Sequence, residues 1–196
     1  VTVKILKAPE VVKAALVGFP TIEDAGSCVA EIIAQGCIPA GMEIMDKALT
    51  KATNDYSKAG YPTDAEAMMI VEFDGTDHEV EDYIGKVKQI AEKNNSSSLK
   101  VSKSNEERLK FWAGRKAAFP ACGVLAPDYM CMDGSIPRGK LAEVLNEISR
   151  LSKKYDLPVA NAFHAGDGNL HPLIMFDANN PDSLRKCEEF GADILK

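Results

Sequence analysis

The sequence lacks several features that would assign it to a large class of proteins. It has no stretch of about 18 apolar residues, so we expect no transmembrane segment. Its net charge is −6 and no block of Lys or Arg offsets that charge, so we expect no nucleic acid among its partners. The G-x-G-x-x-G, P-loop and G-x-S-x-G motifs are all missing, which argues against a nucleotide cradle or an α/β-hydrolase site in these 196 residues.

Cysteine is also used sparingly. The five cysteines form no C-x-x-C pair and their number is odd, so we interpret them as small apolar residues of a reducing compartment, with a reactive thiol or cluster ligand as the alternative. The chain has no signal peptide and opens without Met on a run, residues 1–7, that is typical of a strand. This start indicates a piece of a longer protein.

The pattern of apolar residues predicts the fold class. Thr21 and Ser104 are each followed three residues later by an acid, which predicts the start of a helix at both places. Residues 67–73 form a continuous apolar run of strand length. Strands and helices alternate with some hairpins, so we expect one α+β domain over residues 1–196. We expect ferredoxin-like βαβ units in this domain, with the helices packed on one face of a mixed or antiparallel sheet.

Two of the three histidines flank an Asp-Gly pair in residues 163–172. If Asp167 and Gly168 are the central residues of a type I′ turn, then His164 lies directly opposite His171. Directly opposed residues have Cβ atoms roughly 4.5–5.5 Å apart, which lets two imidazoles share one divalent ion. A hairpin that carries two histidines by accident is the alternative, and no third ligand can be named.

A second candidate is Arg115 in the helix that starts at Ser104. An arginine near the end of a helix can bind a carboxylate through two hydrogen bonds. Spacing alone favours a plainer role, in which cations near the C-terminus of a helix complement its dipole. We interpret Asp167 as a turn residue and His78 as a solvated side chain.

Three segments, taken in order, carry a resemblance to a known family. They are Arg-Lys-Ala-Ala-Phe-Pro at 115–120, Pro-Asp-Tyr-Met-Cys-Met-Asp-Gly-Ser-Ile-Pro-Arg at 127–138, and Val-Ala-Asn-Ala-Phe-His-Ala-Gly-Asp-Gly-Asn-Leu-His-Pro at 159–172. The sequence resembles the C-terminal domain of FAD-linked oxidases. That family includes the flavin-bearing subunit of bacterial glycolate oxidase, D-lactate dehydrogenases and D-2-hydroxyglutarate dehydrogenases.

The resemblance implies a truncated cap domain whose N-terminal FAD-binding domain is absent from this sequence. It implies that His164 and His171 hold a divalent metal (Zn, Mn or Fe), and that Arg115 binds the carboxylate of a small 2-hydroxy acid. The family's third metal ligand and catalytic histidine belong to a later Gly-Glu-His-Gly motif, which this sequence lacks, so no catalytic residue is assigned.

The resemblance further implies oxidation of the 2-hydroxy acid by hydride transfer to flavin, with no activity expected from this chain alone. Other oxidase subunits or a second copy of the chain are candidate partners. We expect a cytoplasmic location, with a peripheral position at the inner membrane as a variant of it. The alternative function is a non-redox α+β module that binds a metabolite or regulates another protein.

Overall fold

The computed structural model describes residues 1–5 and 8–196. Its strands are β1 (Val11–Phe19), β2 (Gly41–Asp46), β3 (Ala67–Gly75), β4 (Ser98–Val101), β5 (Asp128–Cys131), β6 (Gly134–Ser135), β7 (Val159–His164) and β8 (Asn169–Phe176). Its helices are α1 (Ile22–Ala34), α2 (Lys47–Ser57), α3 (Asp77–Lys93), α4 (Asn105–Lys116), α5 (Ala118–Cys122), α6 (Leu141–Tyr155) and α7 (Pro181–Ile194), with a 3₁₀ turn at Arg138–Lys140.

All eight strands belong to one sheet with the order β4-β1-β3-β2-β7-β8-β5, and β6 pairs with β8. Every pairing described is antiparallel. The first four strands, with α1 and α3 as their connecting helices, have the order of a ferredoxin-like unit, and α2 is added between β2 and β3. The predicted α+β class is therefore confirmed, and of the mixed or antiparallel sheet that was expected the structure has the antiparallel form. Strands β7, β8, β5 and β6 extend that sheet beyond β2.

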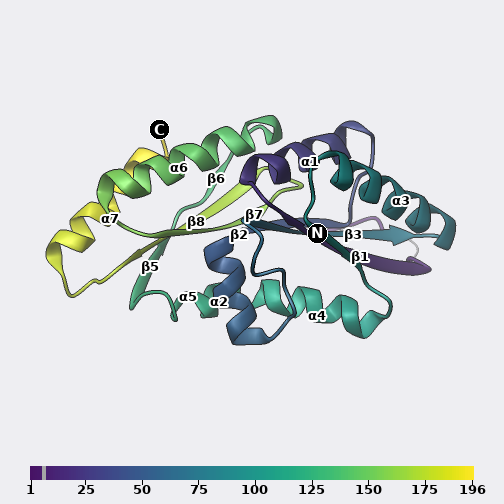
Figure 1. Cartoon of the computed structure of the whole chain (residues 1–196), viewed down its shortest axis with the longest axis horizontal. Coiled ribbons are helices and arrows are strands. Elements are labelled where there is room, and N and C mark those ends of the chain that lie inside the picture. Colours follow the sequence, from purple (N-terminus) through teal and green to yellow (C-terminus); the bar gives the residue numbers. More distant parts are fainter. Residues whose placement is uncertain (6–7) are drawn as a thin grey trace.

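The helices cover both faces of the sheet, although we expected them on one face. Figure 1 shows α1, α3, α6 and α7 on one side of the sheet and α2, α4 and α5 on the other. The core is divided in the same way: Met69 and Val71 belong to one buried cluster, and Met68 and Ile70 belong to the second. Adjacent residues of a strand point to opposite faces, so the continuous apolar run of β3 requires cover on both sides.

Side-chain caps start the helices at the predicted places. The hydroxyl of Thr21 accepts a hydrogen bond from the backbone N–H of Asp24, and that of Ser104 accepts one from Glu107. Asp46 ends β2 and caps α2 in the same manner. These caps satisfy N–H groups that have no partner within the first turn of a helix.

Residues 1–5 lie outside these elements, whereas four of the five cysteines lie within them. The strand expected over residues 1–7 is not formed by residues 1–5, and residues 6–7 lie outside the described part. All five cysteines are free, and only Cys131 is exposed. Within residues 1–5 and 8–196, no helix is long and apolar enough to cross a membrane.

Candidate functional site

The two histidines lie on adjacent strands, but in a different register from the predicted one. His164 pairs with Asn169, and His171 pairs with Ala162. A type I′ turn needs a positive φ at both central residues. Gly168 has a positive φ of 73° but Asp167 does not, so these two residues cannot form that turn and the connection between the strands is longer than expected. The carbonyl oxygen of His164 instead accepts hydrogen bonds from both Asp167 and Gly168.

The changed register still brings the two imidazoles together. It differs from the predicted one by two residues, and an even shift leaves a side chain on the same face of the sheet. The ring centroids of His164 and His171 are 5.1 Å apart, and the ring planes are nearly perpendicular, at 88°. Diagonal neighbours on one face therefore replace the directly opposed pair that the sequence predicted.

Glu43 connects this pair to a positive charge. Its side chain is 11% exposed and lies on β2, directly opposite His164. Its Oε1 lies 2.7 Å from Nδ1 of His164. Its Oε2 accepts a hydrogen bond from Nε of Arg115 at 3.0 Å and forms an ion pair with Nη2 of the same residue, also at 3.0 Å. One buried carboxylate thus holds both the first histidine and the arginine that the sequence singled out.

Close packing of α4 positions Arg115, which is 8% exposed. A Cβ atom at Gly114 would overlap the ring of Tyr61 and the side chain of Ala59, so glycine allows the helix to approach them closely. The hydroxyl of Tyr61 donates a hydrogen bond to the carbonyl oxygen of Phe111, one turn earlier in α4. Arg115 is therefore a buried ion-pair partner, and more than a surface cation at the end of a helix.

Two more polar groups border the histidines. Nδ1 of His171 lies 3.7 Å from Oδ1 of Asp133, and Oδ1 of Asn169 is buried without a hydrogen-bond partner among the described residues. Burial lowers the pKa of His171 below its usual value, and the charges of His164 and Arg115 also lower it, while that of Asp133 acts in the opposite direction. The lowered pKa favours the neutral imidazole, the form that can bind a metal.

The residues present fit a metal only in part. A histidine that binds a metal usually donates its other ring N–H to a carboxylate or a carbonyl group. Glu43 and Asp133 face the Nδ1 atoms of the two histidines, which leaves both Nε2 atoms for a ligand. Among residues 1–5 and 8–196, however, no group of three or more His, Cys, Asp or Glu side chains is placed to hold an ion.

Glu43 and Asp133 are site residues that were not predicted from the sequence. Glu43 could have been found, because a carboxylate between the apolar residues Met42 and Ile44 needs a compensating partner when the strand is buried. Asp133 carries no such signal, because it precedes a glycine and has the sequence context of a turn. His78 is exposed at the start of α3, as expected.

The fold and the motif together indicate the C-terminal domain class of FAD-linked oxidases. Residues 8–196 match the model for the C-terminal domain of FAD linked oxidases, so the chain belongs to that family. It is 50% identical over 196 residues to the glycolate oxidase subunit GlcD of Escherichia coli K12, and 33% identical over 194 residues to that of Bacillus subtilis. It is 32% identical to the mitochondrial cytochrome-linked D-lactate dehydrogenase of Arabidopsis thaliana.

These alignments cover nearly all of this chain but a minor part of each relative. The chain spans 39% of the Escherichia coli protein, 41% of the Bacillus subtilis protein and 34% of the Arabidopsis thaliana enzyme. In the same order, the alignments cover 100%, 99% and 97% of this chain. The relatives are homologous FAD-linked enzymes, and the chain corresponds to their C-terminal part.

Solved structures share the fold at much lower identity. A 4-ethylphenol oxidase from Gulosibacter chungangensis superposes with a TM-score of 0.71 at 9% identity, covering 97% of this chain and 44% of that one. A p-cresol methylhydroxylase superposes with a TM-score of 0.69 at 13% identity, covering 95% and 43%. At these identities the likeness concerns the fold alone.

Proposed function

We propose that this chain is the substrate-binding cap of an FAD-dependent oxidase or dehydrogenase that acts on a small 2-hydroxy acid such as glycolate or D-lactate. The observation that carries the proposal is the convergence of Arg115, Glu43, His164 and His171 on one face of the sheet, in a chain of this family. A cation for a carboxylate and two imidazoles for a metal are the groups that recognition of such a substrate requires.

Each residue has a distinct role in this proposal. Arg115 binds the substrate carboxylate and so orients the α-carbon, while the Nε2 atoms of His164 and His171 provide two ligands for a divalent ion. Glu43 fixes the positions of Arg115 and His164. When bound, FAD supplies the hydride acceptor and the metal supplies a Lewis acid for the hydroxyl group. In the proposal a third metal ligand, the general base and most of the FAD contacts come from outside this sequence.

Calorimetric titration of the metal-stripped chain with Mn²⁺ and Zn²⁺ tests the metal part of this proposal. We expect binding in the micromolar range for the unmodified chain and loss of at least about tenfold in affinity for His171→Ala, because one of two protein ligands is removed. The matched control is His78→Ala, since His78 is the one histidine outside the site and is exposed. Equal affinity of all three proteins would contradict the proposal.

Flavin reduction tests the substrate part, in an FAD-loaded protein that carries this domain. We expect Arg115→Lys to raise the KM for glycolate or D-lactate with unchanged flavin content, because lysine keeps the charge beside Glu43 but cannot bind a carboxylate through a planar fork. Unchanged kinetics would contradict the role of Arg115, and no reduction of the flavin by either acid would favour the non-redox module instead. In that case we expect a 2-hydroxy acid to bind the chain without metal and independently of His171.

A further inference from the structure

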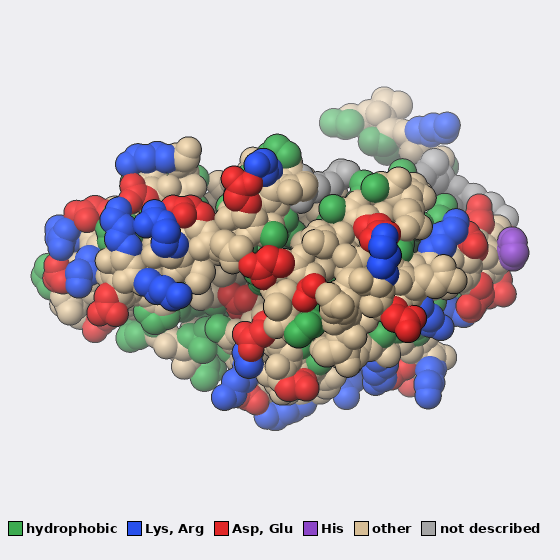
Figure 2. Space-filling view, turned by 45° about the horizontal axis from the view of Figure 1, so that its top comes forward, with side chains coloured by type: hydrophobic (Ala, Val, Ile, Leu, Met, Phe, Trp, Pro, Cys, Tyr) green, Lys and Arg blue, Asp and Glu red, His purple; other side chains and the backbone are tan. Residues whose placement is uncertain are grey.

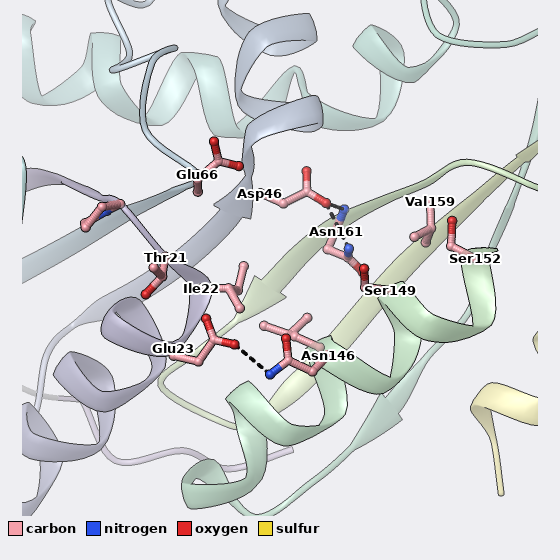
Figure 3. Close-up of a pocket in the computed structure, with 12 residues that line it drawn as sticks. Thr21, Ile22, Glu23, Asp46, Glu66, Asn146, Ser149, Ser152, Val159 and Asn161 are labelled. Atoms are coloured by element: carbon pink, nitrogen blue, oxygen red, sulfur yellow. Dashed lines mark hydrogen bonds between the residues drawn. The ribbon is translucent and has the colours of Figure 1, made fainter. Parts of the chain in front are cut away.

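The side of the sheet opposite the histidines has a pocket between α1 and α6 that is lined by acids. Figure 3 shows Asp46 facing Asn161 and Glu23 facing Asn146, and each carboxylate accepts a hydrogen bond from the facing amide. The third acid, Glu66, forms an ion pair with the first residue of α2. Figure 2 looks onto this side, where acidic side chains occur across the middle and Lys and Arg gather toward α6 and α7. The acids of the pocket have partners within the chain and indicate no ligand.

On the histidine side, buried acids connect the sheet to α4 instead. Glu43 of β2 and Glu72 of β3 lie on the same face of the sheet, and they are diagonal neighbours because Glu72 pairs with Gly41, two residues before Glu43. Their side chains are 11% and 15% exposed. Glu43 forms an ion pair with Arg115, and Glu72 forms one with Arg108. Two ion pairs therefore hold one side of the helix against the sheet.

Glu72 makes a second contact with the helix. Its Oε2 accepts a hydrogen bond from Nη1 of Arg108 at 2.9 Å and another from Nε1 of Trp112 at 2.5 Å. The indole ring of Trp112 also lies against Gly41, where a Cβ atom would come within 3.1 Å of the ring. Glu72 thus binds two successive turns of α4, and the glycine lets the indole approach the strand that carries Glu43.

These contacts restrict the positions that Arg115 can take. A helix held at one residue can still slide or turn about its axis, but Trp112 and Arg108 lie three and seven residues before Arg115 on nearly the same side of α4. Nε and Nη2 of Arg115 already face Glu43. The remaining donors of its guanidinium can meet a substrate carboxylate only if the plane of the group keeps its orientation.

We propose that Glu72 is a positioning residue for substrate binding. Through Trp112 and Arg108 it holds α4 in the register that presents Arg115 to the carboxylate of the 2-hydroxy acid. This inference rests on the proposed function, in which Arg115 binds that carboxylate, and adds a residue that acts through Arg115 without touching the substrate. Loss of the carboxylate of Glu72 should weaken substrate binding and spare the chemical step, because other groups hold the two histidines.

NMR of the ¹⁵N-labelled chain measures the effect of Glu72 on Arg115 directly. We expect Glu72→Gln, which keeps the shape of the side chain and removes its charge, to shift the Nε–H signal of Arg115, since that group donates to Glu43. The variant Arg115→Lys lacks this signal and so identifies it. The matched control is Glu107→Gln, which changes an acid of α4 that pairs with Lys100. An unchanged Arg115 signal in Glu72→Gln, or an equal shift in the control, overturns the proposal.

Kinetics of an FAD-loaded protein that carries this domain separate positioning from stability. We expect Glu72→Gln to raise the KM for glycolate or D-lactate about three- to tenfold, with kcat within about twofold and unchanged flavin content. In the Arg115→Lys background the same change should have no further effect on KM, because the residue that Glu72 positions is already altered. An equal increase in both backgrounds would show that Glu72 acts without Arg115, and the proposal would fail.

A second variant covers the case in which Glu72→Gln does not fold. Trp112→Phe keeps an aromatic ring against Gly41 and leaves the ion pair of Glu72 with Arg108, so we expect a smaller shift of the Arg115 signal and a rise in KM of about twofold. No shift and no rise in this variant would contradict the proposal. The NMR measurement needs neither flavin nor substrate, so it tests the positioning of Arg115 even if the proposed function fails.

Discussion

Two acidic residues of β2, three positions apart, are compensated in different ways. Glu43 meets charged or chargeable partners, because it contacts the guanidinium of Arg115 and the imidazole of His164. Asp46 meets only neutral donors, namely the backbone N–H of Leu49 and the backbone and side-chain amides of Asn161. Burial raises the pKa of Asp46 to about 6 even though these hydrogen bonds act against the rise.

The comparison shows that the number of hydrogen bonds does not decide how a buried carboxylate behaves. Neutral donors do not cancel the negative charge of a carboxylate. Burying that charge away from water therefore still disfavours the ionised form, which raises the pKa of the group. A guanidinium supplies a full opposite charge, which makes the pair mutually dependent, since removing one member leaves the other charge buried and unpaired. Glu43 is therefore tied to Arg115, whereas Asp46 responds to pH.

The largest expected effect follows from breaking the Glu43 pair. We expect Glu43→Ala to lower the free energy of unfolding by about 3–5 kcal/mol, because Arg115 stays buried without its partner. Urea denaturation measures this loss. The double variant Glu43→Leu/Arg115→Met removes both charges and should recover much of the stability. A single variant as stable as the unmodified chain would show that water compensates Arg115 already.

A smaller effect, dependent on pH, is expected at Asp46. Its pKa is raised in the folded state, so its contribution to stability is fully present below the unfolded value of 3.8 and is lost as pH rises to about 6. Asp46→Asn cannot ionise and lacks this loss. The stability of the unmodified chain relative to Asp46→Asn should therefore fall by up to about 3 kcal/mol between pH 4 and pH 6, as measured by urea denaturation. A difference that does not change with pH would contradict the raised pKa.

The smallest effect is expected where a carboxylate is exposed. Glu147 pairs with Arg150 on the surface of α6, and solvent screens such pairs. We expect Glu147→Gln to leave the midpoint of urea unfolding unchanged within error. A clear shift of that midpoint would mean that exposed pairs matter here as well, and the contrast with Glu43 would lose its basis.

Much of the fold could be predicted because it depends on local patterns. Hydroxyl caps and apolar periodicity predicted the starts of α1 and α4 and the α+β class, with the sheet left as mixed or antiparallel. The cover of both sheet faces was not predicted, although the continuous apolar run of β3 carries the signal. Residues 1–5 were wrongly predicted as strand, because alternating β-branched residues favour a strand only where a neighbouring strand can pair with it.

The candidate site was predictable in part for a similar reason. The hairpin and its two histidines follow from local sequence, and the error in register came from assigning a positive φ to Asp167. Glu43 is 121 residues away from His164 in sequence, and Arg115 is 72 away from Glu43. Contacts at such separations depend on strand order, which no local pattern contains. The metal and substrate roles of these residues remain predictions.

The ends of the sheet have a consequence for self-association. The path of paired strands ends in β4 and β5, which are only four residues long. Lys100 on β4 carries a charge at this edge and pairs with Glu107 of α4. Short, charged edge strands offer a poor template for adding a strand from another molecule. We therefore expect this domain to resist edge-to-edge aggregation at high concentration, and any stable dimer to form through its helices or loops.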